Sequence, residues 1–115
     1  GVDTMFPLLM SAVKHGRLGL ERLVQMCCEA PASLFGLSNK GRIEEGYDAD
    51  IVLISEGETA RLKKAPEYSG AGWSPYIGRE VGVSPELVVV GGRVAARGGL
   101  LVEETVPGSA VVYDR

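Results

Sequence analysis

The sequence has little from which a metal centre or a covalent catalytic site could be built. It contains one histidine, His15, and two cysteines, which are adjacent at Cys27 and Cys28. Zinc sites usually take about four ligands, with cysteines spaced by roughly two to four residues. No serine lies in the G-x-S-x-G context of a nucleophile elbow. Two cysteines also exclude a disulfide framework and favour a reducing compartment, so we expect a cytoplasmic protein.

The sequence also lacks a basic stripe and a long apolar run. Its 12 basic and 15 acidic residues are mixed along the chain and give a net charge of −3. We therefore expect no nucleic-acid partner, because such proteins gather positive charge on one face. No apolar segment approaches the roughly 20 residues of a membrane span, and the start of the chain lacks the regions of a signal peptide. We expect no membrane partner.

Apolar residues in the first third of the chain recur at the spacing of one helical face. The first group consists of Phe6, Leu9, Met10 and Val13. It predicts a helix with Asp3 or Thr4 as its cap and Pro7 tolerated in its first turn. Gly16 suits the residue just after the helix, where a left-handed conformation is common.

A second group of apolar residues predicts a second helix. Its members are Leu20, Leu23, Val24, Cys27 and Cys28. We expect Pro31 to close this helix, because the residue before a proline avoids the helical region. Residues 32–37 have room for one further short turn.

Beyond position 38 the pattern changes to that of strands and turns. Of 16 glycines, 13 lie at position 36 or later. The continuous apolar run 51–54 is typical of a strand covered on both faces. Residues 87–96 predict a hairpin around Gly91-Gly92, and Gly98-Gly99 predicts another turn. Further short strands are expected at 59–62, 100–102 and 110–113.

These elements predict an α+β protein in which two amphipathic helices precede short antiparallel strands. Helices with one apolar face and strands with open edges both need a covering layer. The two halves do not obviously complete each other. We therefore expect the chain to be one part of something larger.

The residues with metal-binding chemistry have a simpler structural interpretation. Adjacent cysteines project about 100° apart on an α-helix, so a metal shared by Cys27 and Cys28 would need a distorted helix. We interpret them as two small buried thiols and His15 as a helix-end residue. Asp48 and Asp50 are two residues apart, but no calcium-type loop surrounds them, and a turn before a strand explains both.

Other candidate positions also favour structural roles. The glycine pairs at 91–92 and 98–99 are not followed by a helix, so they predict turns rather than a phosphate-binding loop. Glu103-Glu104 would point to opposite faces of a strand. Trp73 and Tyr76 lie in one loop, where aromatic residues usually anchor the loop to a core.

Six segments of the sequence resemble family motifs, and they occur in the order in which the family has them. They are Gly1–Leu9, Gly16–Val24, Ala30–Leu37, Lys40–Ile54, Gly72–Gly78 and Val90–Gly99. In the same order they resemble motifs in the C-terminal part of dihydroorotases, which are cyclic amidohydrolases. Lys40–Ile54 resembles a K-G-x-I…G-x-D-A-D signature that allantoinases and hydantoinases share. Gly72–Gly78 is more selective, because it resembles the G-W-S-P-[FY]-x-G loop of dihydroorotases.

The resemblance implies a fold and a set of partners. The family fold is a (β/α)₈ barrel with a small β-sandwich built from both ends of the chain. Residues 1–37 would be the last helices of this TIM-type barrel, and residues 38–115 the C-terminal part of the sandwich. A barrel takes roughly 250 residues, so the barrel and the N-terminal sandwich strands would be the main partner. A homo-oligomer is also compatible with this assignment.

The resemblance also implies an activity. Dihydroorotases use zinc to activate the water that opens the small-molecule substrate dihydroorotate to N-carbamoyl-aspartate, a reversible step of pyrimidine biosynthesis. The family's metal ligands lie upstream of the position that matches Gly1, and Gly1 would lie just after the substrate loop. We therefore expect no catalytic, substrate-binding or metal-binding residue in this chain, and no activity from the chain alone.

Two alternatives stay open at this point. The chain could belong to an allantoinase or a hydantoinase, because these enzymes share the D-A-D signature. It could also be a non-catalytic structural or assembly module that kept the sandwich without the chemistry. Such a module would fold cooperatively by itself, whereas part of a larger enzyme would expose apolar side chains such as Leu20, Leu23 and Val24.

Overall fold

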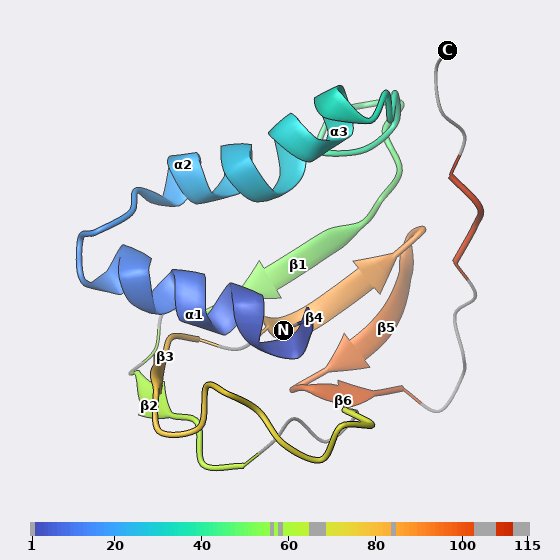
Figure 1. Ribbon diagram of the computed structural model, residues 1–115. Helices are drawn as coiled ribbons and strands as arrows, with labels where there is room; N and C mark the ends of the chain where they lie inside the picture. The colour runs from blue at the N-terminus through green and yellow to red at the C-terminus, as the bar shows by residue number, and fades with distance from the viewer. Residues whose placement is uncertain are drawn as a thin grey trace. The chain divides into compact units, whose positions relative to one another are not determined.

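The computed structural model describes residues 2–55, 57, 59–64, 69–83, 85–102 and 108–111 (Figure 1). The chain forms two compact units, Gly1–Leu20 with Ser55–Ser84 and Glu21–Ile54 with Pro85–Arg115. Each unit combines residues from before and after position 38, where the sequence pattern changes. The assignment of residues 1–37 to a barrel and 38–115 to a sandwich stays a prediction.

The first unit is built on helix α1, Val2–Lys14, which confirms the first predicted helix. Gly16 has a φ of +70°, and the bonds Gly16 N–H to Val13 O and Arg17 N–H to Ala12 O close the helix end as a Schellman motif. The helix begins at Val2, before both of the predicted caps, Asp3 and Thr4. Pro7 therefore lies inside the helix and not in its first turn.

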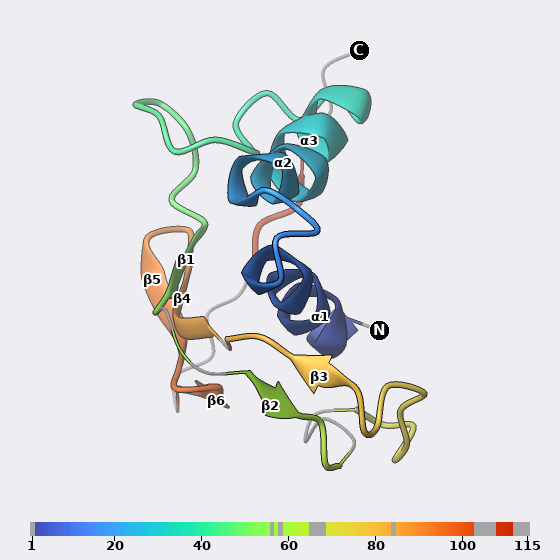
Figure 2. The same cartoon turned by 90° about the vertical axis from the view of Figure 1, so that its left-hand side faces the viewer.

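A short two-stranded sheet completes this unit. Strand β2, Ala60–Arg61, pairs antiparallel with β3, Glu80–Val81, and both views show β3 beside α1 (Figures 1 and 2). β2 confirms the strand expected at 59–62, whereas β3 was not predicted, because two residues are too few to give a period. The Gly82 N–H donates a 2.7 Å hydrogen bond to the Pro7 carbonyl, so the backbone after β3 touches α1 directly.

One continuous helical segment begins at Leu20, the last residue of the first unit's opening stretch, and its remaining residues open the second unit. It consists of α2, Leu20–Val24, a π-helical turn η1, Gln25–Glu29, and α3, Ala30–Leu34. The prediction that Pro31 closes the helix is wrong, because Ala30 keeps helical angles (φ −65°, ψ −45°) and α3 continues past it. In an α-helix the Pro31 ring would clash with the carbonyl four residues earlier. The π-turn, in which Ala30 N–H bonds to Gln25 O, widens the helix there.

The rest of the second unit is an antiparallel sheet in the order β1-β4-β5-β6. Its strands are Ile51–Ile54, Pro85–Val90, Arg93–Arg97 and Leu100–Leu101. The two predicted turns are confirmed: Gly91 and Gly92 have φ values of +55° and +80°, and Gly98 and Gly99 repeat this with +59° and +80°. Positive φ at both central residues is the requirement of the tight hairpin turn that matches strand twist.

The sheet departs from the sequence prediction in two places. β1 lies at the sheet edge with Val52 and Leu53 51% and 53% exposed, so the prediction of cover on both faces is wrong within this chain. Of the strand expected at 110–113, residues 110 and 111 are not in a strand, and the other two lie outside the described residues. A continuous apolar run indicates that a strand is suited to burial on both faces, but the described residues leave Val52 and Leu53 half exposed.

Few apolar side chains are buried in the described part of the chain. Leu23 and Ala32 are the buried hydrophobic residues there, with 3% and 6% of their surface exposed. On the same helical segment Leu20 and Val24 are 48% and 43% exposed, so two of the three apolar residues expected to be uncovered are exposed and Leu23 is not. None of the described helices is long and apolar enough to span a membrane.

We predict that Gly82→Ala destabilises the first unit by about 1–3 kcal/mol, because an added Cβ meets packed backbone. That atom would lie 2.8 Å from Met10 C and from Ser11 N, which cannot move without shifting α1. Urea unfolding followed by circular dichroism measures the change. Gly19→Ala is the matched control: its Cβ would meet nothing within 4 Å, so it should cost nothing. Equal stabilities for the two variants would contradict the close approach of the Gly82 backbone to α1.

Candidate functional site

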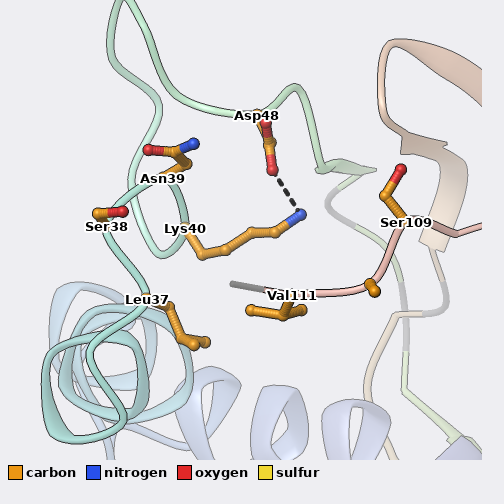
Figure 3. A pocket seen from close by; sticks show the side chains of 8 residues that line it. Leu37, Ser38, Asn39, Lys40, Asp48, Ser109 and Val111 are labelled. Carbon is orange, nitrogen blue, oxygen red and sulfur yellow. Dashed lines mark ion pairs between the residues drawn. The ribbon is translucent and has the colours of Figure 1, made fainter. Parts of the chain in front are cut away.

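The loop between α3 and β1 centres on one lysine held by two carboxylates. The Lys40 Nζ lies 2.9 Å from Asp48 Oδ2 (Figure 3). It also donates to Asp50 Oδ2. The second oxygen of Asp50 accepts a 2.8 Å hydrogen bond from Gly91 N–H. The Asp50 carboxylate therefore joins the loop to the hairpin turn between β4 and β5.

The charges in this cluster stabilise one another. Hydrogen bonds from Lys40 and then from the Gly91 backbone hold the pKa of Asp50 below its ordinary value of 3.8. Hydrogen bonds to Asp50 and Asp48 raise the pKa of Lys40 above 10.5. At neutral pH Lys40 and Asp50 are therefore both charged, and the single ammonium contacts the carboxylates of Asp48 and Asp50.

Backbone contacts hold the same loop in place. Asp48 N–H donates to Asn39 O at 3.0 Å, and Gly92 N–H donates to Ala49 O at 3.0 Å. Gly41 adopts a φ of +90°, and a Cβ there would lie 2.7 Å from Ala32 Cβ and 2.8 Å from Cys28 O. The K-G pair of the signature therefore has two tasks: the lysine binds the aspartates, and the glycine lets the loop approach the helix.

A small cavity of about 120 Å³ opens beside Lys40. Figure 3 shows residues 37–40 and Asp48 on one side and the segment around Ser109 and Val111 on the other. Ligand sites for small molecules are usually roughly 300–1,000 Å³. The cavity is therefore too small for such a ligand, and its one cation is already paired.

A second polar cluster ties α1 to β3 in the first unit. The Glu80 carboxylate accepts a 3.2 Å hydrogen bond from Ser11 Oγ and also binds His15 Nε2. His15 and then Ser11 hold the pKa of Glu80 below its ordinary value of 4.5. Lys14 Nζ donates to Gly57 O at 2.6 Å, which adds a further link from the end of α1.

The Ser11, His15 and Glu80 cluster contains the residue types of a catalytic triad in the wrong order. In a triad the histidine lies between the serine and the acid, so that it can take the serine proton. Here the acid lies between the serine and the histidine, and Ser11 is only 4% exposed. The arrangement is therefore a tether between two elements.

The described residues do not fit a resident zinc ion. They contain no group of three or more histidine, cysteine or acidic side chains that could hold a metal. Asp48 and Asp50, the pair weighed as cation ligands, have the Lys40 ammonium between them. His15 is engaged by Glu80. The metal centre that the family resemblance implies would have to be supplied by other residues.

Several sequence interpretations change at this level. Cys28 is exposed and Cys27 half-buried, so the expectation of two buried thiols is wrong, because the π-turn rotates the later side chains out of the 3.6-residue pattern. Trp73 is 65% exposed and anchors no described core, whereas Tyr76 is half-buried beside Ser74. Glu103, Glu104 and Gly1 lie outside the described residues.

Sequence reasoning missed how the polar residues combine. Asp48 and Asp50 were recognised as a turn, but the lysine that both bind lies eight and ten residues earlier in an irregular loop. Ser11 and His15 are four residues apart on α1 and hence share a face, which was a usable signal. Their partner Glu80 comes 65 residues after His15, and no local pattern connects the two.

Comparison with known proteins places the chain in a family context. A family model described as the amidohydrolase family matches residues 2–95. The chain is 37% identical over 102 residues to a dihydroorotase of Methanothermobacter thermautotrophicus, covering 89% of this chain and 24% of that protein. It is also 37% identical over 107 residues to an L-hydantoinase of Paenarthrobacter aurescens, covering 90% and 23%.

The chain is also similar to part of two solved hydantoinase structures. The L-hydantoinase (dihydropyrimidinase) from Arthrobacter aurescens superimposes with a TM-score of 0.87 at 36% identity, over 96% of this chain and 25% of that one. A D-hydantoinase structure matches with a TM-score of 0.85 at 30% identity, over 95% and 24%. The chain thus spans about a quarter of the length of the proteins it resembles.

We predict that Lys40→Met lowers the free energy of unfolding at pH 7 by roughly 0.5–1 kcal/mol, the scale of a partly exposed ion pair. Because the folded pKa of Asp50 is lowered, its contribution is present above 3.8 and is lost as pH falls through the folded value. The difference between variant and wild type should therefore shrink below that pH. Urea unfolding at a series of pH values tests this, with Lys63→Met as the control on an exposed position. A difference independent of pH would contradict it.

Proposed function

This chain belongs to the amidohydrolase family, and on that premise we propose that it forms the C-terminal portion of a dihydroorotase. The proposal is supported by the order of the six motifs and by dihydroorotase relatives at 33–39% identity. The observation that carries the choice of substrate is the Gly72–Gly78 loop, which is the most selective of the motifs. The parent enzyme would interconvert N-carbamoyl-aspartate and dihydroorotate in pyrimidine biosynthesis.

The reaction is the hydrolysis of a cyclic amide. The oxygen of water forms a bond to the ring carbonyl carbon, the carbon–nitrogen bond breaks, and the nitrogen takes a proton. The product is the open-chain carbamoyl amino acid, and the reverse reaction expels water. The resemblance implies a zinc ion in the parent enzyme. Because the described residues of this chain do not fit that ion, we assign them no step of the chemistry.

The architecture of the parent gives each segment of this chain a place. Residues 1–37 would contribute the last barrel helices, and residues 38–115 the C-terminal part of the small sandwich. This arrangement would cover the exposed apolar residues Leu20, Val24, Val52 and Leu53. The principal partner is then the remainder of the same enzyme, with its barrel and N-terminal sandwich strands.

A hydantoinase is the second candidate, and the solved structures favour it. The two superpositions described above are both on hydantoinases, and the L-hydantoinase relative is as identical to this chain as the dihydroorotase relative. Both reactions open a small ring at an amide bond, so a shared scaffold serves either. The two candidates differ in the substrate, and the substrate-contacting residues that separate them would lie in the rest of the parent enzyme.

Assays of the full-length parent enzyme against dihydroorotate and hydantoin separate the two candidates. We predict turnover of dihydroorotate that exceeds turnover of hydantoin by at least roughly 100-fold, which is about 2.7 kcal/mol of discrimination. The isolated 115-residue chain is the matched control and should hydrolyse neither substrate. A preference for hydantoin would replace the dihydroorotase assignment, and activity of the isolated chain would contradict the absence of an active site in it.

A further inference from the structure

The two cysteines of the chain lie together in its most unusual helical turn. Cys27 and Cys28 occupy the centre of η1, and both are free. Cys28 is exposed and Cys27 is half-buried, so solvent reaches at least one of them readily. π-turns are rare and occur often at functional positions. Neither thiol belongs to the polar clusters described above.

The π-helical geometry of η1 bears on whether Cys27 and Cys28 can bind one ligand together. On an α-helix, neighbouring side chains project about 100° apart, which separates adjacent thiols. A π-turn has more residues in each turn and therefore a smaller angle between neighbours. Because Cys27 and Cys28 both lie in η1, their side chains are expected to project at a smaller angle to each other than on an α-helix.

Electrostatics indicates the same proximity. After burial, the largest cause of the raised pKa of Cys28 is the charge of Cys27, followed by that of Glu29. Two thiolates this close repel each other, which together with burial favours the protonated form of Cys28. A ligand that binds both sulfurs and displaces their protons removes this repulsion.

We propose that Cys27 and Cys28 form a vicinal dithiol site that captures a soft, two-thiolate ligand, with trivalent arsenic or mercury(II) as the chemical class. Thiolates select soft metals and metalloids. Two ligands suffice for this class, so it does not need the third donor that is missing from the described residues. The site is independent of the activity proposed for the parent enzyme.

The capture step balances without an oxidant or a reductant. With phenylarsine oxide, two arsenic–sulfur bonds form and the arsenic–oxygen bond breaks. The two thiol protons leave with that oxygen as water, and arsenic stays trivalent. The second thiol reacts within the same molecule, so its effective concentration is high and the bridged adduct is retained much more strongly than a single bond would be.

The test is to add phenylarsine oxide to the full chain and to record intact mass and free thiols. We expect one arsenical per chain, loss of both thiols, and an adduct that survives excess 2-mercaptoethanol but is removed by 2,3-dimercaptopropanol. After trypsin, the mass should be found on the peptide 23–40, which holds both cysteines and no internal lysine or arginine. Two arsenicals per chain, one remaining thiol, or no adduct would each overturn the proposal.

Three variants separate bridging from simple thiol reactivity. Cys27→Ser and Cys28→Ser each leave one thiol, and each should retain the arsenical roughly 100-fold less well against monothiol. The double variant C28S/E29C keeps two thiols but places them on different faces of the helix, and it should behave like the single variants. Circular dichroism checks that each variant folds. Equal retention by C28S/E29C and wild type would overturn the claim that the adjacent pair is the site.

Discussion

Hydrophobic burial is the constraint on which the rest of this structure depends. In the described residues, the helical segment from Leu20 to Leu34 buries Leu23 and Ala32 but leaves Leu20, Val24 and Met26 substantially exposed. The edge strand β1 leaves Val52 and Leu53 exposed in the same way. One-sided helices and sheets become stable when a second layer covers them. The exposed apolar side chains of this helical segment and of β1 are therefore suited to packing against a further layer.

Polar contacts connect the elements within each unit, where few apolar side chains of the described residues are buried. In the first unit Glu80 joins β3 to α1 through Ser11 and His15. In the second, Asp50 joins the loop lysine Lys40 to the hairpin turn at Gly91. Each tether centres on a carboxylate whose pKa is lowered by its partners. Within the signature that resembles cyclic amidohydrolases, Lys40 and Asp50 thus connect the loop to the sheet.

The sequence was most informative where structure is local. The first helix with its Gly16 end, the β4–β5 hairpin and the Gly98-Gly99 turn all follow from short-range rules, and all are confirmed. The prediction at Pro31 was wrong because a proline usually ends a helix. The π-turn that accommodates Pro31 cannot be recognised from the spacing of apolar residues. The same turn exposes Cys28. Strand β3 pairs with β2, which lies 19 to 21 residues earlier. The contacts of Glu80 with Ser11 and His15 span more than 60 residues, and no local pattern predicts them.

The account's central claim is that this chain is the C-terminal portion of a larger cyclic-amide hydrolase. The exposed apolar residues, the family match and the quarter share of its relatives all support that claim. The most direct test is the denaturing intact mass of the protein isolated from its natural source. The account predicts a polypeptide, or a set of co-purifying polypeptides, several-fold heavier in total than the 12.2 kDa of this chain. A single species at 12.2 kDa that unfolds in one sharp transition would contradict it.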